Sequence, residues 1–263
     1  MFLAVCSAGA YWFITPALIR VARLTGHVIR VDVYAELVAA VAATAIMLRS
    51  IDRRPWVDVG LSRASLGARN LVTGWCVGGG ANVFTCAVLL ATGLLGFART
   101  TDDGSWIGAA FRITLVLVPA ALAEEIICRG YLLTAIRDSI GTRAAVVLTS
   151  VMFGLLHLRN PGATMASVLV VTLSGLLLAM VRIAQDRLYA AWMAHLAWNW
   201  TMAVPFHALV SGIRFDAPRY RAVTSGPAWL SGGDWGPEGG LVAALGLTMG
   251  LAYFHARRRR GEL

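Results

Sequence analysis

The sequence predicts an all-α membrane protein, a bundle of about eight transmembrane helices, and two observations carry this prediction. The chain of 263 residues is 58% hydrophobic and only 14% charged, with a mean hydropathy of +0.68. A soluble globular domain has roughly 25% charged residues and about 45–50% apolar ones. The apolar residues also gather into runs near the length of about 20 residues that a helix needs to cross a bilayer. We therefore expect a multi-pass protein of the cell membrane.

The first four expected spans are apolar runs bounded by charged residues. Residues 2–19 begin without the basic segment that a cleaved signal peptide carries, so we interpret them as a retained span. Residues 33–48 are somewhat short, whereas residues 71–97 are long and rich in glycine. The fourth run, residues 106–123, continues into further helical turns and meets two adjacent acids just past its end.

The other four expected spans lie between loops that contain arginine or turn-forming residues. Residues 144–157 are short for a bilayer, so this helix must be tilted or buried among the others. Residues 164–181 and 188–210 have ordinary lengths for a span, and residues 241–254 are marginal. Eight is therefore the expected count, and the exact number stays open.

The connectors leave no room for a soluble domain. The longest are residues 49–70 and 211–240, and the Gly-rich run within the second is typical of turns and not of a packed element. The four cysteines lie in apolar runs without a C-x-x-C pair, so we expect small buried hydrophobic residues. We divide the chain into N-terminal transmembrane helices at 1–110, a core with the polar clusters at 111–210, and a loop, last span and basic tail at 211–263.

The basic residues indicate contact with a membrane and not with nucleic acid. All 23 are arginine, and they lie in short loops and at the tail beside apolar runs, which suits anionic headgroups. No basic stripe with interleaved aromatic residues exists elsewhere, so we expect membrane lipids and no nucleic acid as partners. With the N-terminus inside, more arginines fall on the side of both termini than on the other side, and the four-arginine tail at 257–260 is the strongest single indication. We therefore predict cytoplasmic termini.

The first polar cluster is Glu124 and Glu125 with Arg129, at the end of an apolar run. Charged side chains inside a bilayer cost several kcal/mol unless they are paired or face water, so they are functional candidates. On a helix Glu125 and Arg129 lie one turn apart on the same face, while Glu124 points about 100° away. Glu124 is thus free to act as a general acid or base. The alternative is an ion-pair cluster that only joins helices.

Two further clusters place histidines in apolar surroundings. His157 follows Phe153 by four residues, and the aromatic ring is expected to pack against the imidazole. His195 and Asn199 have the same spacing, which puts imidazole and amide on one helical face. Such donors could stabilise an oxyanion or contribute to a metal site. The alternatives are an interfacial histidine and an interhelical hydrogen bond by the amide.

The three clusters together resemble the CAAX-protease and bacteriocin-processing family (CPBP, also called Abi) of intramembrane proteases. The pattern of that family is E-E-x-x-x-R, then F-x-x-x-H, then H-x-x-x-N or D, on successive transmembrane helices, and this chain carries all three in order. The resemblance covers roughly residues 111–210. Cys128 departs from the pattern, because family members often have an aromatic residue there, and this position is expected to serve packing.

The resemblance implies an all-helical bundle with its site in the membrane and open to one face. It implies that Glu124 and His157 activate a water that attacks a peptide carbonyl, and that His195 and Asn199 stabilise the oxyanion. The remaining glutamate and arginine of the first cluster would orient the site. The implied catalytic residues are Glu124, Glu125, Arg129, His157, His195 and Asn199.

The requirement for a metal stays open. Members of the family are usually named metalloproteases, and a metal-free glutamate mechanism is also argued for them. A divalent metal such as zinc would find its candidate ligands in Glu124, His157 and His195. No H-E-x-x-H pattern is present, and a glutamate with a histidine also suffices as a general base without metal.

The predicted function is an intramembrane endopeptidase that cuts a peptide bond in a membrane-associated or lipidated, CAAX-like protein or peptide. One alternative is a non-catalytic immunity or chaperone-like membrane partner, in which the polar clusters only stabilise the fold. A second is a proton-coupled transporter, since intramembrane acids and histidines also suit that task. A transporter requires a continuous polar path, whereas several spans contain no ionisable residue other than cysteine or tyrosine.

Overall fold

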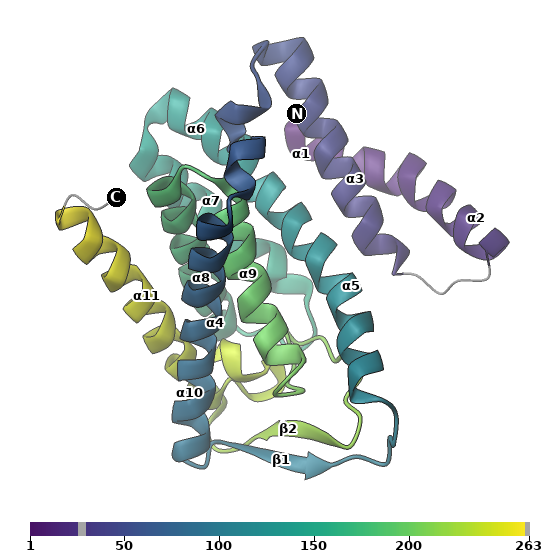
Figure 1. Ribbon diagram of the computed structural model, residues 1–263, viewed down its shortest axis with the longest axis vertical. Helices are drawn as coiled ribbons and strands as arrows, with labels where there is room; N and C mark the ends of the chain where they lie inside the picture. The colour runs from purple at the N-terminus through teal and green to yellow at the C-terminus, as the bar shows by residue number, and fades with distance from the viewer. Residues whose placement is uncertain (26–29, 261–263) are drawn as a thin grey trace.

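Long helices run along a shared direction in the computed structural model, which describes residues 1–25 and 30–260 (Figure 1). A small two-stranded β-sheet lies at one end of the molecule, and the N-terminus lies toward the other end (Figure 1). The helices are α1 Phe2–Ala8, α2 Thr15–Thr25, α3 Val31–Ile46, α4 Ala68–Ala91, α5 Trp106–Glu125, α6 Leu133–Ile140, α7 Thr142–Leu156, α8 Met165–Gln185, α9 Leu188–Ala203, α10 Ala228–Ser231 and α11 Leu241–Arg259.

Wider, π-helical turns join or extend several of these helices. Gly9–Ile14 joins α1 to α2, Met47–Asp52 extends α3, and Ile126–Leu132 joins α5 to α6. The third of these turns begins directly after the two acids of the first polar cluster, so α5 and α6 belong to one continuous helical stretch, Trp106–Ile140. The remaining short turns are the 3₁₀ segments Trp56–Val59, Arg63–Leu66, His157–Arg159, Gly233–Trp235 and Pro237–Gly239.

The all-α membrane architecture is confirmed, with five helical stretches in the described residues long and apolar enough to cross a membrane. The other three predicted spans are also helical but shorter: α7 has 15 residues, α9 has 16, and the apolar part of α11 is Leu241–Arg257. The count of eight is therefore not confirmed. The five stretches are Phe2–Arg20, Val31–Asp52, Ala68–Ala91, Trp106–Ile140 and Met165–Gln185.

Two predicted spans end earlier than expected. The span at 71–97 was expected to be helical throughout, but α4 ends at Ala91 and Gly93 takes a left-handed φ of 71° that closes the helix. The chain then forms β1, Leu95–Arg99, which pairs antiparallel with β2, Tyr220–Thr224. The span at 188–210 ends with α9 at Ala203. Val204 still donates its N–H to the Trp200 carbonyl oxygen, but Pro205 has no N–H with which to continue the helix.

The Gly-rich run at 231–240 was expected to hold no packed element, and this expectation is wrong. It contains two 3₁₀ turns, and Trp235 in the first is only 1% exposed. Gly232 and Gly236 adopt φ values of 89° and 105°, which side-chain-bearing residues rarely adopt. Glycine thus lets the backbone fold tightly enough to bury this segment against the helices. The cysteine prediction holds for three residues but fails for Cys76, which is exposed.

Close packing of α4 on α9 fixes the helix that carries the third polar cluster. A Cβ atom at Gly74 would lie 2.2 Å from the carbonyl oxygen of Ala190, and one at Gly78 would lie 1.8 Å from that of Ala194. Glycines of this kind let helix backbones approach closely in membranes. Because Ala194 precedes His195, this contact holds the imidazole-bearing face of α9 in place.

Candidate functional site

The three polar clusters come together around one cavity between the helices, as the family resemblance implies. Glu124 and Glu125 end α5, and the π-helical turn Ile126–Leu132 follows them. The second cluster lies where α7 ends, and the third lies on α9. A cavity of about 350 Å³ is lined by four of the six predicted residues, namely Glu124, His157, His195 and Asn199.

The other two predicted residues form a buried network behind the cavity. Glu125 and Arg129 are both 0% exposed, and Arg129 Nη1 donates to Glu125 Oε1 at 2.9 Å. Arg129 Nη2 also donates to the carbonyl oxygen of Gly175 on α8, at 3.2 Å. His195 Nδ1 lies 3.0 Å from Glu125 Oε1, so the carboxylate accepts from both the guanidinium and the imidazole. This network fixes the ring of His195 and directs its Nε2 atom toward the cavity.

Glu124 faces both histidines. Its Oε2 atom lies 4.0 Å from His157 Nε2 and 4.0 Å from His195 Nε2. This oxygen is buried and has no hydrogen-bond partner among the described residues, although the side chain as a whole is 31% exposed. Polar atoms separated by more than about 3.5 Å commonly have a water between them. The arrangement suits a small polar ligand held by one carboxylate and two imidazoles.

Phe153 orders both imidazoles. His157 Nδ1 lies 2.8 Å from the Phe153 carbonyl oxygen and donates to it, so in the neutral ring Nε2 accepts from the cavity side. The Phe153 ring packs 4.8 Å from the His157 ring, as expected, and meets His195 edge-on at 5.7 Å. The guanidinium carbon of Arg129 lies 4.2 Å above the same ring. One aromatic side chain therefore touches all three clusters.

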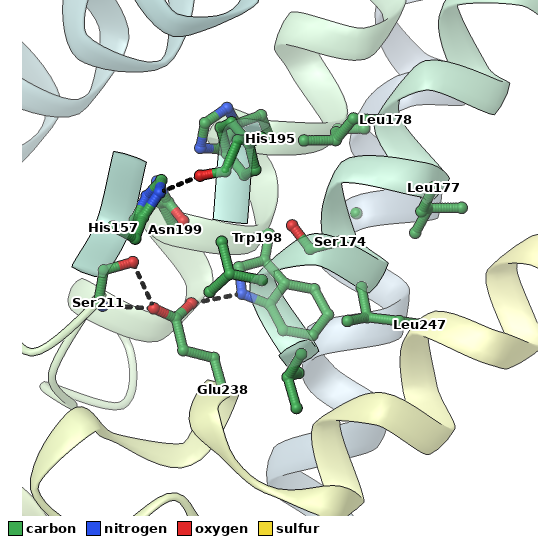
Figure 2. Close-up of a pocket in the computed structure, with 15 residues that line it drawn as sticks. His157, Ser174, Leu177, Leu178, His195, Trp198, Asn199, Ser211, Glu238 and Leu247 are labelled. Atoms are coloured by element: carbon green, nitrogen blue, oxygen red, sulfur yellow. Dashed lines mark hydrogen bonds between the residues drawn. The ribbon is translucent and has the colours of Figure 1, made fainter. Parts of the chain in front are cut away.

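Asn199 lies one helical turn beyond His195 and is half-buried at the same cavity. Figure 2 shows Asn199 and His157 at a pocket that Glu238 and Ser211 also line. These side chains also line a small neighbouring cavity of about 30 Å³, which is room for a water. An amide there can donate to a carbonyl oxygen bound in front of His195.

Glu238 is a site residue that the sequence analysis missed. It is 6% exposed, its Oε2 accepts from Trp198 Nε1 at 2.7 Å, and its Oε1 accepts from Ser211 Oγ at 2.8 Å and from the Ser211 backbone N–H (Figure 2). Ser211 in turn accepts at its carbonyl from Asn160 Nδ2, at 3.1 Å. Through Glu238, the Gly-rich segment is therefore linked by Ser211 to the turn after His157, and by Trp198 to the helix just before Asn199. The sequence pattern of that segment does not indicate that Glu238 is a site residue.

Glu36 on α3 is a second missed residue, and here the sequence did carry a signal. Its side chain lines the same cavity as Glu124. A carboxylate in the predicted span at 33–48 is the same kind of intramembrane charge that singled out Glu124. The cavity wall beyond these acids is largely apolar, with Leu117, Ile127 and Phe215 among its residues.

The donor chemistry of Glu124, His157 and His195 suits zinc, but their spacing does not fit a bound ion. Ligand atoms of a tetrahedral zinc at bond lengths of about 2.0–2.1 Å lie roughly 3.3 Å apart, whereas the glutamate oxygen lies 4.0 Å from each imidazole nitrogen. Among the described residues, no group of three or more His, Cys, Asp or Glu side chains is placed to hold a metal. The zinc site stays a prediction.

The match to a known family falls on this part of the chain. Residues 105–201, about a third of the chain, match the family model described as type II CAAX prenyl endopeptidase Rce1-like. They include α5, α7, α8 and nearly all of α9, and thus all three polar clusters. No curated protein and no solved structure matches the chain. The resemblance to the CPBP family is confirmed as a resemblance, because residues 105–201, which hold all three polar clusters, match the type II CAAX prenyl endopeptidase Rce1-like model.

Proposed function

We propose that the protein is an intramembrane endopeptidase that hydrolyses a peptide bond in a membrane-associated or lipidated protein or peptide. The observation that carries the proposal is the position of Glu124 Oε2, which lies 4.0 Å from two imidazole Nε2 atoms at a cavity within the bundle. A carboxylate and an imidazole so placed can bind one water between them and remove its proton. The family match at residues 105–201 supports the same reaction class.

The reaction begins with a water between Glu124 and His157. Glu124 takes a proton from this water as its oxygen attacks the peptide carbonyl carbon, which forms the new C–O bond and places negative charge on the carbonyl oxygen. His157 Nε2 accepts the second hydrogen of the water in a hydrogen bond and orients the attack. Glu124 then gives its proton to the peptide nitrogen, the C–N bond breaks, and the amine leaves.

His195 and Asn199 stabilise the oxyanion. His195 lies between two carboxylates, since Nδ1 contacts Glu125 and Nε2 faces Glu124. With hydrogen on both ring nitrogens, Nδ1–H donates to Glu125 and Nε2–H donates to the oxyanion. The Asn199 amide supplies a second donor one turn away. Glu125 and Arg129 act through His195, because their buried pair keeps the ring in this orientation.

Comparative peptidomics of membranes tests the proposal. Cells expressing wild type, Glu124→Gln, His157→Ala or the control Asp103→Asn are compared at matched protein levels. Asp103 is exposed and lies outside the helices, so its variant repeats the change from carboxylate to amide away from the site. We expect peptides that wild type and the control release and that both site variants fail to release. Identical profiles in all four strains would refute the proposal and favour the non-catalytic partner.

A further inference from the structure

A second cavity adjoins the catalytic cavity and is lined by arginines. It measures about 470 Å³ and lies between α3 and α5, with Arg30, Arg112 and Arg214 in its wall. We call it the arginine vestibule. It shares Arg30, Val116 and Phe215 with the catalytic cavity, so the two are neighbouring compartments on one side of the bundle.

The arginine vestibule carries more positive than negative charge. Arg30 pairs with Asp32 at 2.8 Å, and Arg112 pairs with Asp216 at 2.9 Å. Arg214 is exposed and has no acidic partner in the part of the chain that the structure describes. Three guanidinium groups thus meet two carboxylates, and one cation is left to bind an anion.

The walls of the vestibule are held together by a contact between helices. The Tyr34 hydroxyl on α3 donates to the carbonyl oxygen of Leu115 on α5 at 2.9 Å. This bond joins the helix after Arg30 to the helix that carries Arg112, so two of the arginines lie on elements in direct contact. Arg214 lies in the loop between α9 and β2. The next residue in the chain, Phe215, lines the wall that the vestibule shares with the catalytic cavity.

The two compartments have opposite charge. The catalytic cavity is lined by Asp32, Glu36 and Glu124 together with Arg30, whereas the vestibule beside it is lined by the three arginines together with Asp216. A peptide bound across both would place its scissile bond at the acids and an anionic group at the arginines. Arginine binds carboxylates through two parallel N–H···O bonds, a geometry that lysine does not offer. Because the two cavities share a wall, one bound peptide can reach both of them. We therefore expect the anion at the arginines to be a group of the substrate itself and not a separate ligand.

We propose that the arginine vestibule binds the free C-terminal carboxylate of the peptide substrate and so selects bonds near a chain end. This proposal rests on the proposed endopeptidase function. It adds that the enzyme recognises the terminal carboxylate, with Arg214 as the unpaired cation and Arg112 as its neighbour on α5. The anionic headgroup of a lipid is the competing occupant.

Paired peptides test this inference on the purified full-length protein in neutral-lipid nanodiscs. Peptides released in the peptidomics experiment are synthesised with a few residues beyond the cut, once as free acids and once as C-terminal amides. Wild type, Arg112→Gln and Arg214→Gln are compared with Arg99→Gln, an exposed position on β1 outside both cavities. We expect amidation to raise the wild-type KM about tenfold, equivalent to about 1.4 kcal/mol, with kcat unchanged.

The variants separate the possible outcomes. Arg214→Gln and Arg112→Gln should raise KM for the free acid toward that for the amide, and leave cleavage of the amide and the Arg99→Gln control unchanged. Equal KM values for acid and amide in wild type would overturn the vestibule proposal while cleavage itself upholds the proposed function. An Arg214→Gln defect that appears only when phosphatidylglycerol is added would assign the site to a lipid and also overturn it. Absence of cleavage by wild type would refute both proposals.

Discussion

Replacing Glu125 with glutamine removes one charge from the buried network and keeps the size of the side chain. Glu125 is the only described acid within ion-pair distance of Arg129, and both residues are 0% exposed. The guanidinium would keep its bond to the Gly175 carbonyl and its contact with the Phe153 ring. Neither supplies a negative charge, so Glu125→Gln leaves a buried cation without compensation.

The cost of this substitution follows from the burial of both partners. Breaking a fully buried ion pair by removing one side destabilises a protein by about 3–5 kcal/mol. The whole free energy of unfolding of a domain is about 5–15 kcal/mol, so Glu125→Gln should remove a large part of it. Glu124→Gln is the matched comparison. That side chain is 31% exposed and forms no contact shorter than 4.0 Å to a cation, so a change below about 1 kcal/mol is expected.

Denaturant unfolding of the purified variants in detergent micelles measures both values. A double variant, Glu125→Gln with Arg129→Met, separates the stranded charge from lost packing. If the charge is responsible, the double variant should recover most of the stability that Glu125→Gln loses, because apolar residues can replace a buried pair at little cost. A Glu125→Gln protein as stable as wild type, or a double variant less stable than the single one, would refute this reasoning.

Three further substitutions probe the scaffold around the site. Glu238→Gln weakens the charge-assisted bonds from Trp198 and Ser211, and should lower the unfolding free energy by about 1–3 kcal/mol in the same denaturant assay. Gly78→Val pushes α4 away from α9 and should lower the thermal midpoint by several degrees, whereas Gly80→Ala, with open space around it, should not. Burial lowers the pKa of His207 in the folded protein, so the unfolded chain binds a proton there more readily than the folded protein does. The free energy of unfolding should therefore decrease as the pH falls below about 6.5, and it should decrease less in His207→Gln.

Much of the candidate site could be predicted from local spacing. The pair of Glu125 with Arg129, the packing of Phe153 on His157, and the common face of His195 and Asn199 all follow from separations of four residues. Such contacts form within one helix and need no knowledge of the fold. Their convergence on one cavity depends on packing between helices, and it was expected only because the combined pattern resembles a family.

The rest of the site depends on contacts that no local pattern encodes. Glu238 reaches Trp198 across 40 residues of sequence, from a segment whose glycines indicate turns and conceal its burial. Glu36 was visible as a charge in a span, but its place beside Glu124 depends on α3 packing against α5. The ends of α4 and α9 were misplaced because apolar residues continue past Ala91 into β1, which is mostly exposed, and past Ala203 into a largely buried loop. Apolar composition there does not distinguish helix from strand or loop.

The direction in which the cavity opens can be measured. Ser211, Ile213 and Phe215 line it from the loop that leads into β2, and β2 lies at the end of the molecule opposite the N-terminus (Figure 1). If both termini are cytoplasmic, as the arginine distribution predicts, substrates must enter from the other face of the membrane, and a lipidated cytoplasmic C-terminus would not reach Glu124.

Cysteine labelling in intact cells decides between the two orientations. In a Cys76→Ser background, which removes the exposed native thiol, Asp103→Cys reports on the end that holds the β-sheet and Ser139→Cys on the end of α6. We expect a membrane-impermeant maleimide to label position 103 and not position 139, which would place the cavity on the non-cytoplasmic face. Labelling of position 139 alone would reverse the predicted topology. The cavity would then open to the cytoplasm, where a lipidated CAAX-like C-terminus could reach Glu124 and the arginine vestibule together.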